Sequence, residues 1–98
     1  MPLHALALSF ELRLPGCRSL KDKRGRLAVV RRELGRRFAV SMAEVDHQDR
    51  PDRSTWAVAV VSGDAHTIGR VGLQLRKLVD SLPEVEVLEV HAAHLVEE

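Results

Sequence analysis

The sequence LHALALSFELRL, residues 3–14, alternates bulky side chains with small or polar ones along its whole length. The bulky residues are Leu6, Leu8, Phe10, Leu12 and Leu14, and those between them are Ala5, Ala7, Ser9, Glu11 and Arg13. A period of two is typical of a β-strand that buries one face. Pro15-Gly16 is a turn signal, so we expect this strand to end at Leu14.

A helix is predicted directly after this turn. The segment Ser19-Leu20-Lys21-Asp22 has the form of a capping box, in which the serine hydroxyl accepts a free N–H group and the acid reaches back. Apolar residues then recur at helical spacing, and we expect the helix to end near Gly35. The residues of this apolar stripe are Leu20, Leu27, Val30 and Leu34.

The rest of the chain repeats this alternation of strand and helix. Residues 38–45 and 56–61 predict two strands joined by the polar loop 46–53. Asp64 is a good N-cap, and the apolar residues from Ile68 to Leu82 predict a helix that ends before Pro83. In the last expected strand, residues 84–96, a change of parity between Val87 and Leu88 predicts a β-bulge.

The order βαββαβ predicts an α+β protein. Right-handed crossovers and short connections favour a ferredoxin-like sandwich, in which a four-stranded antiparallel sheet carries two helices on one face. Ninety-eight residues suffice for one such core and are too few for two. We therefore expect residues 1–98 to form a single ferredoxin-like domain.

Composition bears on location. No apolar run approaches the roughly 20 residues that cross a bilayer, and the N-terminal residues carry no basic leader. Cys17 is the single cysteine, which excludes an internal disulfide. We expect a cytoplasmic protein that does not enter a membrane.

Positive charge is concentrated in residues 18–37, RSLKDKRGRLAVVRRELGRR. This segment holds nine of the fifteen Lys and Arg residues and only two acids, a net charge of +7, whereas the other 78 residues carry −6. Such a concentration is the usual electrostatic mark of a surface that meets phosphate. On a helical wheel, Lys21, Arg32 and Arg36 project outward, and Lys23 projects close to the buried face.

This segment is the candidate nucleic-acid or anion site, and RNA or a ribosomal subunit is the expected partner. The free N–H groups at the helix N-terminus add to the attraction for an anion. The site residues that we predict are Arg18, Ser19, Lys21, Lys23, Arg24, Arg32 and Arg36. A merely solvated Arg-rich helix and an acidic protein partner remain alternatives.

The sheet face without helices should be lined by small residues. They are Ala5, Ala7, Ser9, Ala39, Ser41, Ala43, Ala57 and Ala59. No aromatic side chain stands there, so bases are not expected to stack on the sheet. A second copy of the chain packed on this face, giving a homo-oligomer, and a solvated face are the two interpretations that remain.

A second candidate lies in the loop after residues 38–45, where Asp46, His47 and Asp49 fall within four positions. Such a trio can bind a metal or hold a general base, but strand alternation sends Asp46 and His47 to opposite sides. We therefore assign no metal, no cofactor and no catalytic residue. A small enzyme that uses Lys23, Asp46 and His47 is the less favoured alternative.

Three stretches resemble one small bacterial family, the DUF503 or YlxP-like proteins. They are residues 14–24 with LPG and RSLKDKR, residues 40–49 with VSMAEVDHQD, and Ala59–Ser62. The resemblance implies a ferredoxin-like fold and no assigned activity. Genes of this family often stand beside those for translation initiation and small-subunit maturation factors, which implies a role near the ribosome. The chain departs from the family pattern after Asp49, at Arg50-Pro51-Asp52.

Overall fold

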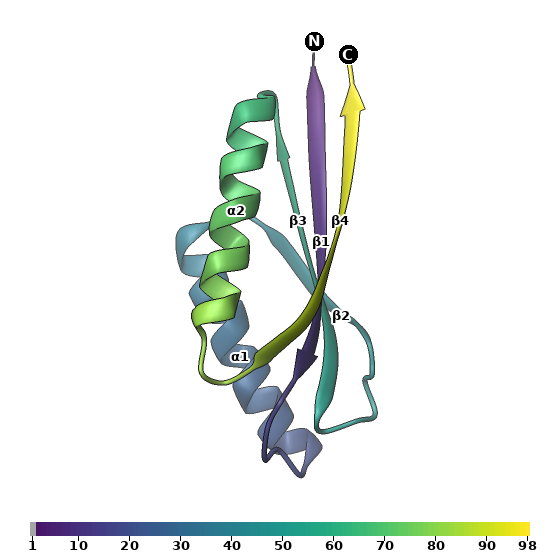
Figure 1. Ribbon diagram of the computed structural model, residues 1–98, viewed down its shortest axis with the longest axis vertical. Helices are drawn as coiled ribbons and strands as arrows, with labels where there is room; N and C mark the ends of the chain where they lie inside the picture. The colour runs from purple at the N-terminus through teal and green to yellow at the C-terminus, as the bar shows by residue number, and fades with distance from the viewer. Residues whose placement is uncertain (1) are drawn as a thin grey trace.

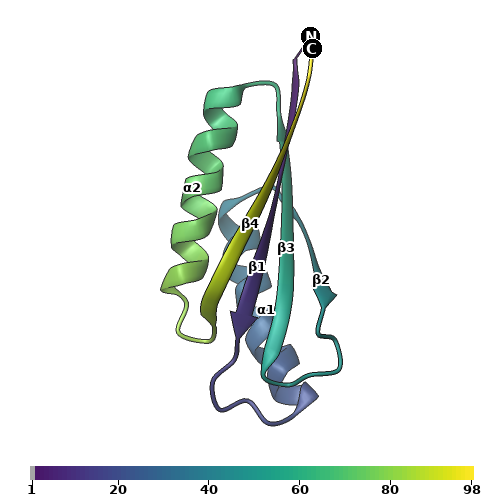
Figure 2. The same cartoon turned by 45° about the vertical axis from the view of Figure 1, so that its right-hand side comes forward.

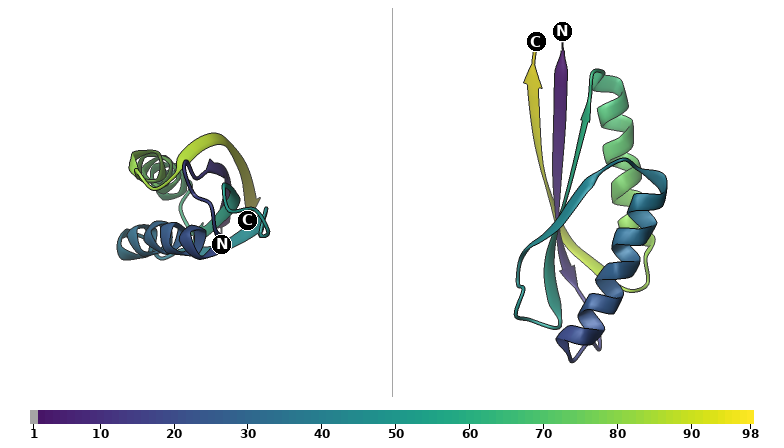
Figure 3. Two further views of the ribbon diagram at one scale, coloured as in Figure 1. Left: turned by 90° about the horizontal axis from the view of Figure 1, so that it is seen from below. Right: turned by 180° about the vertical axis from the view of Figure 1, so that it is seen from behind.

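The structure is a computed structural model that describes residues 2–98. Its elements are β1 (Leu3–Arg13), α1 (Leu20–Arg37), β2 (Ser41–Asp46), β3 (Arg53–Ser62), α2 (Ala65–Ser81) and β4 (Glu86–Glu97) (Figure 1). The strands form one antiparallel sheet in the order β2-β3-β1-β4. Both helices cover the same face, as the end-on view in Figure 3 shows. The predicted ferredoxin-like βαββαβ fold is confirmed.

The alternation of β1 builds the core. Its bulky residues Leu8, Phe10 and Leu12, and Leu14 just after it, are almost completely buried, whereas Ala7 and Arg13 are exposed. The helices contribute Leu27, Val30 and Leu34 from α1 and Ile68, Leu75 and Val79 from α2. Because each of these side chains loses its contact with water, each stabilises the fold by about 1.5–3 kcal/mol.

The helix α1 differs from the prediction in two places. It runs to Arg37, because the Phe38 N–H group donates to the Leu34 carbonyl and closes a further turn beyond Gly35. Leu20, predicted in the apolar stripe, is 39% exposed. Lys23 takes the buried position in the first turn instead, which corrects the stripe.

All four strands have bounds that differ from those predicted, and β2 and β3 differ most. β2 begins only at Ser41, so Phe38 and Ala39 belong to the connection that precedes it. β3 begins already at Arg53, because Arg53, Ser54 and Thr55 pair with Arg13, Leu12 and Glu11 of β1. The end of the predicted loop is therefore part of the sheet.

Each edge strand carries a bulge at the same level of the sheet. In β4, Glu89 pairs with Glu11 and Val87 with Leu12, so Leu88 is the extra residue and the predicted bulge is confirmed. In β2, Glu44 pairs with Trp56 and Asp46 with Thr55, which leaves Val45 as an unpredicted extra residue. A bulge re-aims the side chains beside it.

Different segments of the chain lie at the two ends of the molecule. The chain termini lie side by side at one end, whereas the β1–α1 turn and the β2–β3 loop lie at the other (Figures 1 and 2). The first turn of α1 therefore stands near the loop that holds Asp46, His47 and Asp49. In residues 2–98 no helix is long and apolar enough to span a membrane.

Candidate functional site

Lys23 is enclosed by its own protein. Its ammonium donates to the carbonyl oxygens of His47 at 2.6 Å and Arg50 at 2.8 Å, and lies 2.8 Å from Glu44 Oε2. The side chain is 3% exposed. Because two of its N–H bonds are donated to carbonyl oxygens and its charge is paired with Glu44 in an almost closed position, Lys23 is not free to hold an anion. Lys23 therefore fastens the β2–β3 loop to α1, which corrects its assignment to the anion site.

Three other polar side chains in or next to this helix form contacts within the protein. Ser19 Oγ accepts the Asp22 N–H group at 3.1 Å, so the serine half of the predicted capping box forms. Arg26 donates to the Pro15 carbonyl at 2.7 Å and joins the β1–α1 turn to the helix. Arg36 lies 3.6 Å from Glu33, an exposed pair of the kind that contributes little free energy.

The remaining basic side chains of the segment have no such partner. All are exposed, and within residues 2–98 none of them lies within ion-pair distance of a carboxylate: Arg18, Lys21, Arg24, Arg31, Arg32 and Arg37. Six unneutralised cations on one helical segment produce a strong local positive potential. Compared with the predicted site, this surface lacks Ser19, Lys23 and Arg36, which have partners within the protein, and it gains Arg31 and Arg37.

Three of these arginines border a groove between α1 and the sheet. Its volume is about 440 Å³, and it is lined by Arg24, Leu27, Ala28, Arg31, Arg32 and Trp56. The guanidinium carbon of Arg31 lies 5.1 Å from the centre of the Trp56 ring, which is a cation–π contact. The floor is thus apolar and the rim cationic.

Sequence reasoning missed Trp56 and Arg31 as site residues. On a helical wheel Arg24 and Arg31 fall on the same edge of the apolar stripe, and the alternation of residues 56–61 directs Trp56 toward the helices. The missing information was which strand lies under that edge of α1. Only the sheet order, with β3 between β2 and β1, supplies it.

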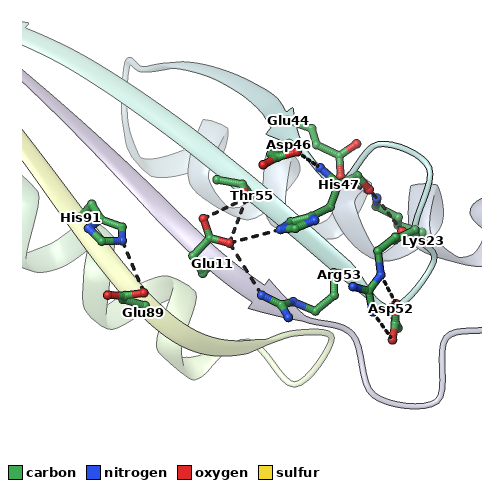
Figure 4. A network of polar contacts seen from close by, with 11 residues as sticks. Glu11, Lys23, Glu44, Asp46, His47, Asp52, Arg53, Thr55, Glu89 and His91 are labelled. Atoms are coloured by element: carbon green, nitrogen blue, oxygen red, sulfur yellow. Dashed lines mark hydrogen bonds and ion pairs between the residues drawn. The ribbon is translucent and has the colours of Figure 1, made fainter.

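A polar network lies at the loop end of the sheet (Figure 4). Thr55 Oγ1 lies 2.9 Å from both carboxylate oxygens of Glu11 and donates its proton to that group. His47 Nε2 lies 3.7 Å and an Arg53 guanidinium nitrogen 3.9 Å from the same carboxylate. Glu11 was not predicted, because its β1 position is simply polar in the sequence.

The trio Asp46, His47 and Asp49 does not form one site. The Asp46 carboxylate accepts the backbone N–H group of His47 at 2.7 Å, whereas the His47 ring turns toward Glu11 and Asp49 is exposed. His47 has a φ of +63°, a left-handed conformation that is uncommon outside glycine. Across residues 2–98 no three His, Cys, Asp or Glu side chains are grouped to hold a metal.

The sheet face opposite the helices carries a second groove of about 590 Å³. The predicted small residues Ala5, Ala7, Ala39, Ser41 and Ala59 line it. Val61 and Leu95 also line it and are 69% and 57% exposed, so this face is more apolar than the alanine pattern suggested.

Comparisons with solved structures support the fold. A de novo designed protein, Foldit4, superposes with a TM-score of 0.52 at 16% identity over 96% of this chain and 99% of its own. LarC2, the C-terminal domain of a cyclometallase involved in the synthesis of the NPN cofactor of lactate racemase, gives 0.50 at 13% identity. That match covers all of this chain and 58% of the LarC2 chain. At these identities the likeness shows the fold alone.

Sequence comparison places the chain in a family. The uncharacterised protein YlxP of Bacillus subtilis (strain 168) is 31% identical over 68 residues, which are 69% of this chain and 74% of that protein. Residues 6–92 match the family described as "Protein of unknown function (DUF503)". The match spans all four strands and both helices, and the chain therefore belongs to the DUF503 family.

Proposed function

We propose that the protein is an RNA-binding accessory module that holds RNA phosphates on the exposed arginines of α1, and that a ribosomal subunit is its partner. The observation that carries this proposal is the group of six cations without a carboxylate partner on a segment of twenty residues. Like charges so close together repel one another and destabilise a helix. A polyanion that neutralises them relieves this repulsion and releases its own counterions.

The sheet is a poor alternative surface for RNA. Ala5, Ala7 and Ala59 offer neither charge nor an aromatic ring, and the acidic Glu11 lies further along the same face. The helical surface of Arg24, Arg31 and Arg32 offers charge and exposure together. The proposed contact is therefore made by α1, through phosphates.

Co-sedimentation with purified ribosomal subunits across a salt series tests the proposal. The test variant carries Arg24→Glu, Arg31→Glu and Arg32→Glu. Its matched control carries Arg70→Glu, Arg76→Glu and Lys77→Glu, three exposed positions on α2 with the same change in net charge. We expect the wild type and the control to sediment with subunits at low salt and the α1 variant to remain in the supernatant.

Two results would overturn the proposal that α1 binds RNA. One is a wild type that stays in the supernatant at low salt with either subunit. The other is equal loss of binding in the α1 variant and its α2 control, which would mean that only net charge matters. Circular dichroism on each variant shows that the fold is kept.

A second candidate function, assembly with another copy of the chain, is favoured by the apolar open face. Val61 and Leu95 are large, apolar and more than half exposed, and they line a 590 Å³ groove with the small residues of β1 and β3. A two-fold contact between two such faces buries the same patch on both copies. The small side chains let the two sheets approach closely.

Analytical ultracentrifugation measures the oligomeric state of the protein directly. We expect a wild-type dimer at micromolar concentration that becomes a monomer when Val61→Asp and Leu95→Asp are introduced. Sedimentation as a monomer at all concentrations would exclude the assembly. The two proposed functions use different faces and are independent.

A further inference from the structure

The groove beside α1 has more chemistry than a phosphate contact requires. Phosphates alone need only charge, which Arg18, Lys21 and Arg37 also supply from open surface. The groove adds an apolar floor of Leu27, Ala28 and the edge of Trp56 beneath the cationic rim. Its volume of about 440 Å³ lies within the range of about 300–1,000 Å³ that ligand pockets occupy.

Arg31 differs from the other unneutralised cations in being held in place. The Trp56 ring lies under its guanidinium at 5.1 Å, and this contact restrains the side chain without neutralising it. An arginine that is already ordered loses less conformational entropy when it binds a ligand. Its outer face is a planar, positively charged platform of the kind on which RNA bases stack.

Trp56 adds an unused hydrogen-bond donor. The residue is 3% exposed, and its Nε1–H group is buried without an acceptor in the part of the chain described. A buried donor without an acceptor is unfavourable for the free protein. A ligand oxygen that reached this N–H group would remove that cost.

We propose that this groove binds one unpaired RNA nucleotide, with its base stacked on Arg31 above Trp56 and its flanking phosphates on Arg24 and Arg32. The inference rests on the proposed RNA-binding function and adds to it a preference for single-stranded over double-helical RNA. A base-paired nucleotide keeps its faces stacked within the duplex and cannot offer one to Arg31. The stack contributes sequence-tolerant affinity, since every base has a π-face.

Trp56 is the only tryptophan of the chain, so intrinsic tryptophan fluorescence reports on the surroundings of this one ring. The test titrates the full protein with an oligouridylate, with an oligomer of equal length and charge that lacks its bases, and with a duplex of equal phosphate number. We expect the oligouridylate to change Trp56 fluorescence and to bind about tenfold more tightly than the abasic oligomer. The duplex should bind at the abasic level.

Arg31→Lys separates stacking from charge. The variant keeps the positive charge and loses the planar platform, so the oligouridylate should bind it only as tightly as the abasic oligomer does. Arg70→Lys, made at an exposed position on α2 that does not line the groove, is the control and should leave the tenfold preference unchanged.

Three results would overturn the inference. Equal affinity for the oligouridylate and the abasic oligomer would mean phosphate contact alone, and the proposed function would stand without the nucleotide site. Binding of the oligouridylate with no change in Trp56 fluorescence would place it elsewhere. An oligoglutamate peptide that binds more tightly than the oligouridylate, with the same fluorescence change, would assign the groove to an acidic protein. Absence of binding by every nucleic acid contradicts the proposed function itself.

Discussion

Lys23 shows how much of a single residue's position and contacts can be predicted from the sequence. The helical wheel placed it near the buried face, and the structure buries it there. Its partners could not be predicted, because two of them are backbone carbonyls of His47 and Arg50, groups that every residue has. Their positions depend on the path of a loop more than twenty residues away. Charge alone therefore assigned Lys23 to ligand binding, whereas its geometry makes it structural.

Replacing Lys23 should cost much more stability than replacing an exposed lysine. Lys23→Met leaves the Glu44 carboxylate and two carbonyl groups without their donor, and we expect the free energy of unfolding to fall by about 3 kcal/mol. Urea denaturation measures this, with Lys21→Met as the exposed control. Adding Glu44→Gln should restore part of the loss, because the unpaired carboxylate charge is then absent. Equal stability of the Lys23→Met and Lys21→Met variants would contradict the structure.

Two glycines of α2 should respond in opposite directions to alanine. A Cβ at Gly72 would lie 2.7 Å from Leu6 Cδ2, since α2 approaches β1 closely there. Gly72→Ala should destabilise the fold by about 1–3 kcal/mol through overpacking. At Gly69 a Cβ meets nothing within 4 Å, so Gly69→Ala should stabilise the helix by up to about 1 kcal/mol. Thermal unfolding of both variants checks the pair, and a shift of the melting temperature in the same direction for both would be the contrary result.

Among the helices and strands, the features that could be predicted were those marked by the spacing of apolar residues. The bulge at Leu88 was predicted because the apolar parity visibly changes between Val87 and Leu88. The bulge at Val45 was not predicted, because its neighbours Glu44 and Asp46 are polar and a single apolar residue between them is too little to establish a new parity. The network around Glu11 was missed for the same reason, since it is formed by polar residues next to that bulge.

The start of α2 should make stability depend on pH. Asp64 accepts hydrogen bonds from the Thr67 hydroxyl at 2.7 Å and from the backbone N–H groups of His66 and Thr67 at 3.2 Å each. The Thr67 hydroxyl is the main cause that lowers the pKa of Asp64 from its ordinary value of 3.8, and the His66 N–H group adds to it. A carboxylate with a lowered pKa stabilises the fold above pH 3.8, and this stabilisation is lost as the pH falls through the lower folded-state pKa.

Asp64→Ala should therefore be less stable than the wild type at neutral pH. The difference in melting temperature between the two proteins should shrink as the pH falls below 3.8, because the wild-type carboxylate becomes protonated. Asp80→Ala, at an exposed position near the other end of α2, is the matched control. A difference between wild type and Asp64→Ala that stays constant from neutral to acid pH would show that the carboxylate charge does not contribute to the cap.

At the scale of the whole molecule, the two βαβ halves share one core. The central strand β1 pairs with both β3 and β4, and its side chains pack with those of both helices. We propose that the chain unfolds as one domain. Urea transitions followed by Trp56 fluorescence and by far-ultraviolet circular dichroism should then coincide. Two separated transitions would mean that the halves are independently stable.

The overall fold was predictable because it depends on apolar periodicity and connection length, which a single sequence displays. The basic surface was predictable as a region, since nine cations in twenty residues are visible without coordinates. The sequence did not show which of those cations lack a partner, because the acceptors of Lys23 and Arg26 lie in distant segments. The structure therefore limits the surface to the six unneutralised residues and singles out the groove at Trp56.

The central claim is that α1 binds RNA through Arg24, Arg31 and Arg32, with phosphates held by Arg24 and Arg32. Its most direct test is the salt dependence of oligouridylate affinity, measured by fluorescence anisotropy of the labelled RNA. For single strands the slope of log K against log salt is about −0.7 per neutralised phosphate. Reversing the three α1 charges should make the slope shallower by about 1.4, which is about 0.7 for each of the two phosphates on Arg24 and Arg32, while the Arg70, Arg76 and Lys77 reversals leave it unchanged. Equal slopes for the wild type and the α1 variant would contradict the account.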